Sequence, residues 1–110
     1  NTVEYFVHHE DVRRAGPNPA GPRALPEGEE KQLHRALKRM SRVMYRKVPF
    51  GVDLTDADGK VLPVGKNRKV GITGAIGELV LFSSGRVDAA HVRISGKPED
   101  EAVLKRSLGF

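Results

Sequence analysis

The fold is decided by the stretch from residue 49 to residue 73, which reads PFGVDLTDADGKVLPVGKNRKVGIT. After Pro49 apolar residues alternate with polar ones, and a period of two is typical of strands with one buried face. Short Gly-containing segments divide the stretch into three predicted strands, at residues 51–55, 60–64 and 68–73. Pro63 cannot donate to a neighbouring strand, so it makes the second strand an edge or irregular strand.

Upstream of this stretch, residues 27–47 carry the strongest helical signal in the chain. Apolar residues recur at steps of four, three, four and four and form one stripe: Leu33, Leu37, Met40, Met44 and Val48. Basic residues form a second stripe on another face: Lys31, Arg35, Lys38, Arg42 and Arg46. We expect the middle of the apolar stripe, Leu37 to Met44, to be buried against the sheet. The basic stripe should be solvated, with His34 at the surface.

Downstream, residues 75–86 are ambiguous, because their apolar run suits either a strand or a short buried helix. Residues 89–95 alternate again and predict a further strand on which His91 is exposed. Pro98 suits the first turn of a final helix, which Gly109 would end. A helix, a strand meander and further helical elements together predict an α+β domain.

The composition limits the chemistry that the chain can perform. Its 110 residues suit one domain with a modest core, and 38% of them are hydrophobic and 30% charged. Without cysteine the chain has no disulfide, no thiolate nucleophile and no zinc finger, which fits a cytoplasmic setting. The longest apolar run, residues 79–82, is too short to cross a membrane. We therefore predict a cytoplasmic protein that does not enter the membrane.

The charge balance points to anionic partners. The formal net charge is +5, which favours phosphates, carboxylate metabolites or nucleic acid. In the nucleic-acid interpretation, the basic stripe would be an electrostatic track for an anionic polymer. Aromatic residues make up only 5% of the chain and Trp is absent, so the usual stacking platform for bases is lacking. We therefore favour a small-molecule substrate over nucleic acid.

The chain begins with NTVEYFVHHED, residues 1–11, which we interpret as part of a helix already under way. Glu4 and His8 are four residues apart, so a helix places both side chains on one face. Asp11 follows on the same side, one turn further on. A carboxylate and an imidazole placed in this way can occupy two coordination positions of one divalent metal. Two ligands do not make a tight site, so either the segment is only a helix end or further ligands lie in sequence that this chain lacks.

Residues 1–15, NTVEYFVHHEDVRRA, resemble the end of the fourth helix in a bacterial metal-binding family, the mycothiol-dependent maleylpyruvate isomerase group of the DinB-like superfamily. Two later segments, GAIGELVLFSSGR at 74–86 and VRISG at 92–96, resemble the C-terminal domain of that family. The resemblance implies a four-helix bundle with a metal on its inner face, followed by an α+β domain similar to sterol carrier proteins. That domain would be a small, mostly antiparallel sheet covered by helices, in which residues 77–84 are helical.

The resemblance also implies a division of the chain and a site. The chain would consist of the C-terminal end of a metal-binding helix at 1–15, a Pro/Gly-rich connection at 16–26 and the sterol-carrier-like domain at 27–110. The family's Glu-x-x-x-His pattern falls on Glu4 and His8, whereas its third ligand, a histidine from an earlier helix, has no counterpart here. Asp11 matches a recurrent acidic position and would orient His8 or balance its charge.

These expectations combine into one functional hypothesis with two rivals. The chain would be a fragment of a divalent-metal-binding protein related to thiol-dependent isomerases or transferases, with zinc the first choice of metal and the substrate unassigned. Its partner would be the missing helical bundle of the same protein. A low-molecular-weight thiol such as mycothiol would supply the nucleophile that a cysteine-free chain lacks. The alternatives are a non-enzymatic α+β module that binds a small ligand or lipid, and a basic nucleic-acid adaptor.

Overall fold

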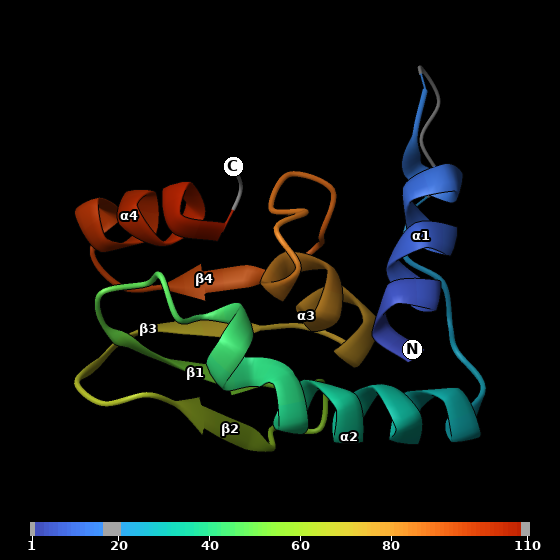
Figure 1. The fold of residues 1–110 in the computed structure, drawn as a ribbon, viewed down its shortest axis with the longest axis horizontal. Helices are drawn as coiled ribbons and strands as arrows, with labels where there is room; N and C mark the ends of the chain where they lie inside the picture. Colours follow the sequence, from blue (N-terminus) through green and yellow to red (C-terminus); the bar gives the residue numbers. More distant parts are fainter. Residues whose placement is uncertain (1, 17–20, 109–110) are drawn as a thin grey trace.

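The computed structural model describes residues 2–16 and 21–108 (Figure 1). Along the described chain the elements are α1 (Thr2–Arg14), α2 (Glu27–Met44), β1 (Gly51–Thr55), β2 (Val61–Val64), β3 (Arg68–Thr73), α3 (Ile76–Ser83), β4 (Arg93–Ser95) and α4 (Pro98–Leu108). The predicted α+β class is confirmed, because helices cover a small four-stranded sheet. Part of the predicted connection at 16–26 and the predicted helix end at Gly109 lie outside the described residues.

The sheet is mixed, with strand order β2-β1-β3-β4. β1 pairs antiparallel with β2, β3 pairs antiparallel with β4, and the two central strands β1 and β3 run parallel. The sheet is therefore mostly antiparallel, as predicted. The predicted meander is wrong, because β3 pairs with β1 instead of with β2, which precedes it along the chain. β1 and β3 have the predicted bounds, and β2 begins one residue later than predicted.

This departure from a meander depends on Gly51, the first residue of β1. After β2 the chain crosses the beginning of β1 to reach its far side, and the Gly51 N–H donates to the Asn67 carbonyl oxygen over 3.2 Å. A Cβ at position 51 would lie 2.7 Å from the Lys66 carbonyl oxygen and 2.8 Å from that of Val64. Glycine therefore leaves the room that the crossing needs. The connection itself turns through left-handed conformations at Gly65 (φ 77°) and Asn67 (φ 57°).

α2 has one apolar and one basic face, as predicted. Leu37 is buried, the basic stripe is exposed, and Met40 and Met44 are only half-buried because they lie at the margin of the apolar face. The helix ends at Met44, three residues earlier than predicted, because the chain turns at Tyr45 and that ring is buried in the core. α2 packs mainly against α3 and contacts the sheet chiefly at β2. Its apolar face therefore lies on the sheet only in part.

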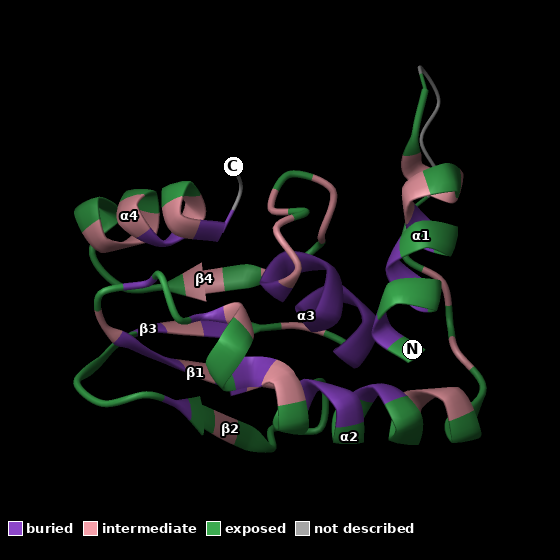
Figure 2. Cartoon of the chain, viewed as in Figure 1, coloured by how far each residue is buried: buried purple, intermediate pink, exposed green. Residues whose placement is uncertain are grey.

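The ambiguous segment at 75–86 contains the helix α3, in agreement with the helix that the family resemblance implies at 77–84. All eight residues of α3 are buried, and Figure 2 shows the helix buried along its whole length. α1 and α2 both pack against it. Because every side of α3 is covered, its sequence shows no separation of polar and apolar faces, so its pattern could not distinguish a helix from a strand.

β4 is shorter than the strand predicted at residues 89–95, because only the last three of these residues pair with β3. The Ala89 carbonyl oxygen accepts a hydrogen bond from Arg14, and the His91 N–H donates to Glu78. The first half of the predicted strand is therefore bound to α1 and α3 instead of to the sheet. His91 is exposed, as predicted.

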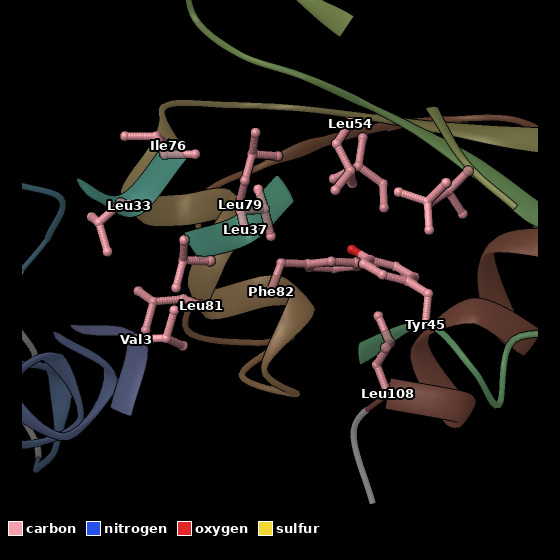
Figure 3. Packing of buried hydrophobic residues seen from close by; sticks show 14 of the residues in the cluster. Val3, Leu33, Leu37, Tyr45, Leu54, Ile76, Leu79, Leu81, Phe82 and Leu108 are labelled. Carbon is pink, nitrogen blue, oxygen red and sulfur yellow. The ribbon is translucent and has the colours of Figure 1, made fainter. Parts of the chain in front are cut away.

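One hydrophobic core joins the helices to the sheet (Figure 3). Phe82 of α3, Leu37 of α2 and Leu54 of β1 are buried within it. Leu104 and Leu108 of α4 complete the same cluster, and α4 packs against β3. The core reaches α1 through the apolar residues near the start of that helix, so α1 is held on the same body as the sheet.

Candidate functional site

α1 carries the candidate metal ligands, and it is attached to the rest of the fold by one face. The buried residues of α1 follow one helical stripe: Val3, Phe6, Val7 and Glu10. The helix approaches α3 so closely that a Cβ added at Gly77 would lie 2.9 Å from the ring of Phe6. The opposite face of α1 is open, with Tyr5 79% exposed. The orientation of α1 is therefore set on one side only within the described part of the chain.

Glu4 and His8 are both exposed and lie one helical turn apart, as the sequence predicts. Together with Asp11 they line a shallow pocket of about 210 Å³, whose wall also includes Ser84 and Arg86, just after α3. The hydroxyl oxygen of Ser84 is buried and has no hydrogen-bond partner among the described residues. Ser84 therefore lines the pocket, while its hydroxyl oxygen is enclosed by the protein.

Asp11 is held by Arg86. The Nε and Nη2 atoms of Arg86 lie 3.2 Å and 2.9 Å from the two carboxylate oxygens of Asp11. This forked arrangement balances the charge of Asp11, and the hydrogen bond to Asp11 raises the pKa of Arg86. In the described part of the chain Asp11 makes no hydrogen bond to His8, so its predicted role in orienting that ring stays a prediction.

The described residues offer part of a metal site. No group of three or more His, Asp or Glu side chains that could hold a metal ion occurs in residues 2–16 and 21–108. His9 is exposed on α1 but points about 100° away from His8. His34 lies on α2 and His91 lies before β4, so neither joins the pair. A carboxylate oxygen from Glu4 and an imidazole nitrogen from His8 form a donor set that zinc accepts, and they fit two of its coordination positions.

Behind this face α1 carries a buried carboxylate that our sequence interpretation missed. The side chain of Glu10 is fully enclosed and accepts hydrogen bonds from three arginines: Arg13 (2.5 Å), Arg14 (3.1 Å) and Arg23 (2.9 Å). Burial alone would raise the pKa of Glu10, but the hydrogen bond from Arg23 and the other arginine contacts outweigh it and hold the pKa below its ordinary value. Glu10 is therefore ionised, and it ties α1 to the segment that leads into α2.

Arg14 links Glu10 to Glu78 on α3. Its Nη1 and Nη2 atoms lie 2.7 Å and 2.9 Å from the two carboxylate oxygens of Glu78, while its Nε donates to Glu10. Nη1 also donates to the Ala89 carbonyl oxygen. The side chains of Arg14 and Glu78 are only 5% and 6% exposed. Burial alone would raise the pKa of Glu78, but the hydrogen bonds from Arg14 and from the His91 N–H outweigh it and leave the pKa lowered.

A narrow cleft of about 110 Å³ runs along this network, between α1, residues 22–25 and the beginning of α3. Its buried charged groups are Glu10, Arg14 and Glu78, and they already bind one another. Sites for drug-sized ligands measure about 300–1,000 Å³, so this cleft is better described as a seam between elements. In the sequence, the four-residue spacing of Glu10 and Arg14 and the carboxylate of Glu78 inside an apolar run were the available signals.

No family model, no curated protein and no solved structure matches this chain. Among the described residues, no helix combines the length and the apolar character that crossing a membrane requires. Three features of the molecule bear on its function: the α+β fold, the exposed pair of Glu4 and His8 beside a pocket, and the buried ion-pair network behind that pair.

Proposed function

We propose that α1 supplies two ligands, Glu4 and His8, to a divalent metal site, with zinc as the first choice of metal. The observation that carries the proposal is their placement one turn apart on the exposed side of α1, where they line the same 210 Å³ pocket. The remaining ligands come from a helical bundle of the same protein that packs on this open side. On this proposal the protein belongs with thiol-dependent isomerases and transferases.

The residues of the chain have distinct parts in such a site. The Glu4 carboxylate and the His8 imidazole hold the metal, which when bound lowers the pKa of a coordinated thiol or water. The thiol must come from a small molecule such as mycothiol, because the chain contains no cysteine. The pocket has room for a small ligand beside the pair. The Asp11–Arg86 ion pair forms one wall and contributes no net charge.

Zinc titration calorimetry tests this proposal, with the 110-residue chain compared with a longer protein that includes the bundle. The chain alone should bind zinc weakly, because two protein ligands leave most of the coordination shell to water. The longer protein should bind one equivalent, and binding should weaken as the pH falls from about 7.5 to about 5.5, because protonated imidazole cannot coordinate.

His9 provides a matched control for His8, because it is the next residue on the same helix and is also exposed. In the longer protein, His8→Ala should abolish stoichiometric zinc binding, whereas His9→Ala should leave it intact. Glu4→Gln should be better tolerated than His8→Ala, since water replaces an oxygen ligand more readily than it replaces imidazole. Full zinc occupancy in the His8→Ala protein would refute the assignment.

The rival proposal of a lipid-binding module has less support. A lipid requires a large apolar cavity, whereas the cleft at the α1–α3 seam and the pocket beside Glu4 measure only about 110 Å³ and 210 Å³, and both have charged side chains in their walls. Where α2 and α3 meet β1, the space is filled by packed side chains, among them Leu37, Leu54 and Phe82 (Figure 3). The metal-binding proposal is therefore preferred.

A further inference from the structure

Two kinds of contact hold α1 on the fold, and they differ in what they can fix. Val3, Phe6 and Val7 give α1 an apolar stripe that packs into the core. Apolar burial is not directional, so these contacts limit the rotation of the helix about its own axis through shape alone, as where Phe6 packs on Gly77. The second kind is directional: the partly exposed Asp11–Arg86 pair, the Arg23–Glu10 bond, and the most buried of them, the network in which Arg14 joins Glu10 to Glu78.

The network is a costly way to obtain stability alone. Removing charged groups from water carries a penalty, and well-packed apolar residues in place of a buried ion pair are often neutral or stabilising. The side chain of Glu10 is fully enclosed, and those of Arg14 and Glu78 are 5% and 6% exposed. What a forked ion pair adds beyond apolar packing is geometry, since both nitrogens of the fork must face both carboxylate oxygens.

We infer that Arg14 is a positioning residue for the metal ligands. By bridging Glu10 on its own helix and Glu78 on α3, it fixes the rotation of α1 and so directs Glu4 and His8 toward the pocket beside Ser84 and Arg86. The metal part of this inference rests on the proposed function. The structural part, that Arg14 sets the rotation of α1, stands independently of it.

Arg14 and His8 belong to one continuous helix, so a rotation of α1 about its axis turns the side chain of His8 through the same angle. A side-chain tip lies about 6 Å from the helix axis, so a rotation of about 10° moves it by roughly 1 Å. A working site holds its groups within about 0.5 Å of the productive geometry. A modest rotation of α1 is therefore enough to impair metal binding while the fold remains intact.

The decisive experiment replaces the ion pair by apolar groups of similar size, in the double variant Arg14→Met/Glu78→Met. We expect the variant to remain folded, with a cooperative urea transition, although the Ala89 carbonyl oxygen and the His91 N–H lose their partners. Residual dipolar couplings of the α1 backbone amides in the 110-residue chain should nevertheless show a changed or averaged helix orientation. In the longer protein, zinc affinity should fall at least tenfold. This combination separates positioning from stability.

A matched control is the double variant Arg68→Met/Asp53→Met, which removes an ion pair of 2.8 Å between β3 and β1, away from α1. It should leave both the α1 couplings and the zinc affinity unchanged. If the control shifts the α1 couplings as much as the Arg14/Glu78 variant does, the inference is wrong. Unchanged α1 couplings in the Arg14/Glu78 variant also overturn it, whatever happens to zinc.

Arg14→Lys keeps the inference testable if the double variant does not fold. Lysine keeps the charge but offers a single ammonium group, which cannot fork onto Glu78 while also reaching Glu10. Altered α1 couplings in this variant support the inference, and couplings identical to the wild type overturn it. Absence of zinc binding in the wild-type longer protein would refute the proposed function instead, and it would leave the α1 couplings as the test of positioning.

Discussion

The hydroxyl oxygen of Tyr45 lies 2.6 Å from Oγ of Ser83, and this hydrogen bond joins the turn after α2 to the last residue of α3. The two residues are 38 positions apart in sequence and both are buried. Burial raises the pKa of Tyr45, and the hydrogen bond to Ser83 offsets only part of that effect. The phenol therefore keeps its proton. The pair links the end of α2 to the end of α3 inside the core.

Removing one partner of this bond should destabilise the fold by about 1–2 kcal/mol, because the other hydroxyl is left buried without a partner. We expect this loss for both Tyr45→Phe and Ser83→Ala, measured by urea unfolding. The double variant should lose little more than either single variant, since it removes both partners. Strictly additive losses would show that the two hydroxyls do not depend on each other.

The two faces of α2 should respond differently to truncation. Leu37 is 2% exposed and belongs to the core, so Leu37→Ala should cost about 2–5 kcal/mol. Arg42 is exposed, so Arg42→Ala should change the free energy of unfolding by less than about 0.5 kcal/mol. Thermal unfolding followed by circular dichroism measures both. Similar melting shifts would contradict the assignment of the faces.

Two glycines should respond to alanine with opposite signs. Gly51→Ala should destabilise by about 1–3 kcal/mol, because the new methyl group meets the carbonyl oxygens of the crossing connection at 2.7 Å and 2.8 Å. Gly28 lies in α2 with nothing within 4 Å of its would-be Cβ, so Gly28→Ala should stabilise by up to about 1 kcal/mol. Chemical unfolding of both variants measures the difference. A neutral Gly51→Ala protein would show that the crossing can move aside.

The free energy of unfolding should depend on pH because of Glu78. The folded protein holds the pKa of Glu78 below its ordinary value of 4.5, so its contribution is present above pH 4.5 and is lost as the pH falls further through the folded-state pKa. At pH 7, Glu78→Gln should cost about 1–3 kcal/mol, because Arg14 loses a buried charged partner. The difference between wild type and variant should shrink below pH 4.5.

Urea unfolding at closely spaced pH values between 7 and about 3 measures this difference. Glu99→Gln, on the exposed first turn of α4, is the control and should show no comparable effect at any pH. If the wild type remains more stable than Glu78→Gln by the same free energy down to pH 3, the ionised carboxylate is not what stabilises the contact.

Local pattern was enough to predict most elements of this fold. The period of two after Pro49 predicted three strands, and the stripe through Leu37 predicted α2, because both depend on neighbours along the chain. The pairing of β3 with β1 could not be predicted in this way, since it depends on a backbone crossing at Gly51 that no periodicity records. α3 was ambiguous because complete burial removes the polar face on which helical patterns depend.

The candidate site also combines a feature that local sequence predicts with one that depends on the three-dimensional fold. The four-residue spacing of Glu4 and His8 is a local property, and the structure places both on the exposed side of α1. The network behind them joins Arg14 to Glu78 across 64 positions of sequence. Its members are ordinary charged residues until the fold encloses them, so only the three-dimensional arrangement distinguishes them from solvated charges.

The strand order also bears on self-association. The outer strands of the sheet are β2 and β4, and an outer strand is where a second chain can add by backbone hydrogen bonding. β2 contains Pro63, which has no N–H to offer, and β4 is only three residues long. Although Val61 on β2 is 52% exposed, neither edge provides a long, uninterrupted template. Both features oppose the pairing of edge strands from two molecules, which is one route by which β-containing proteins aggregate.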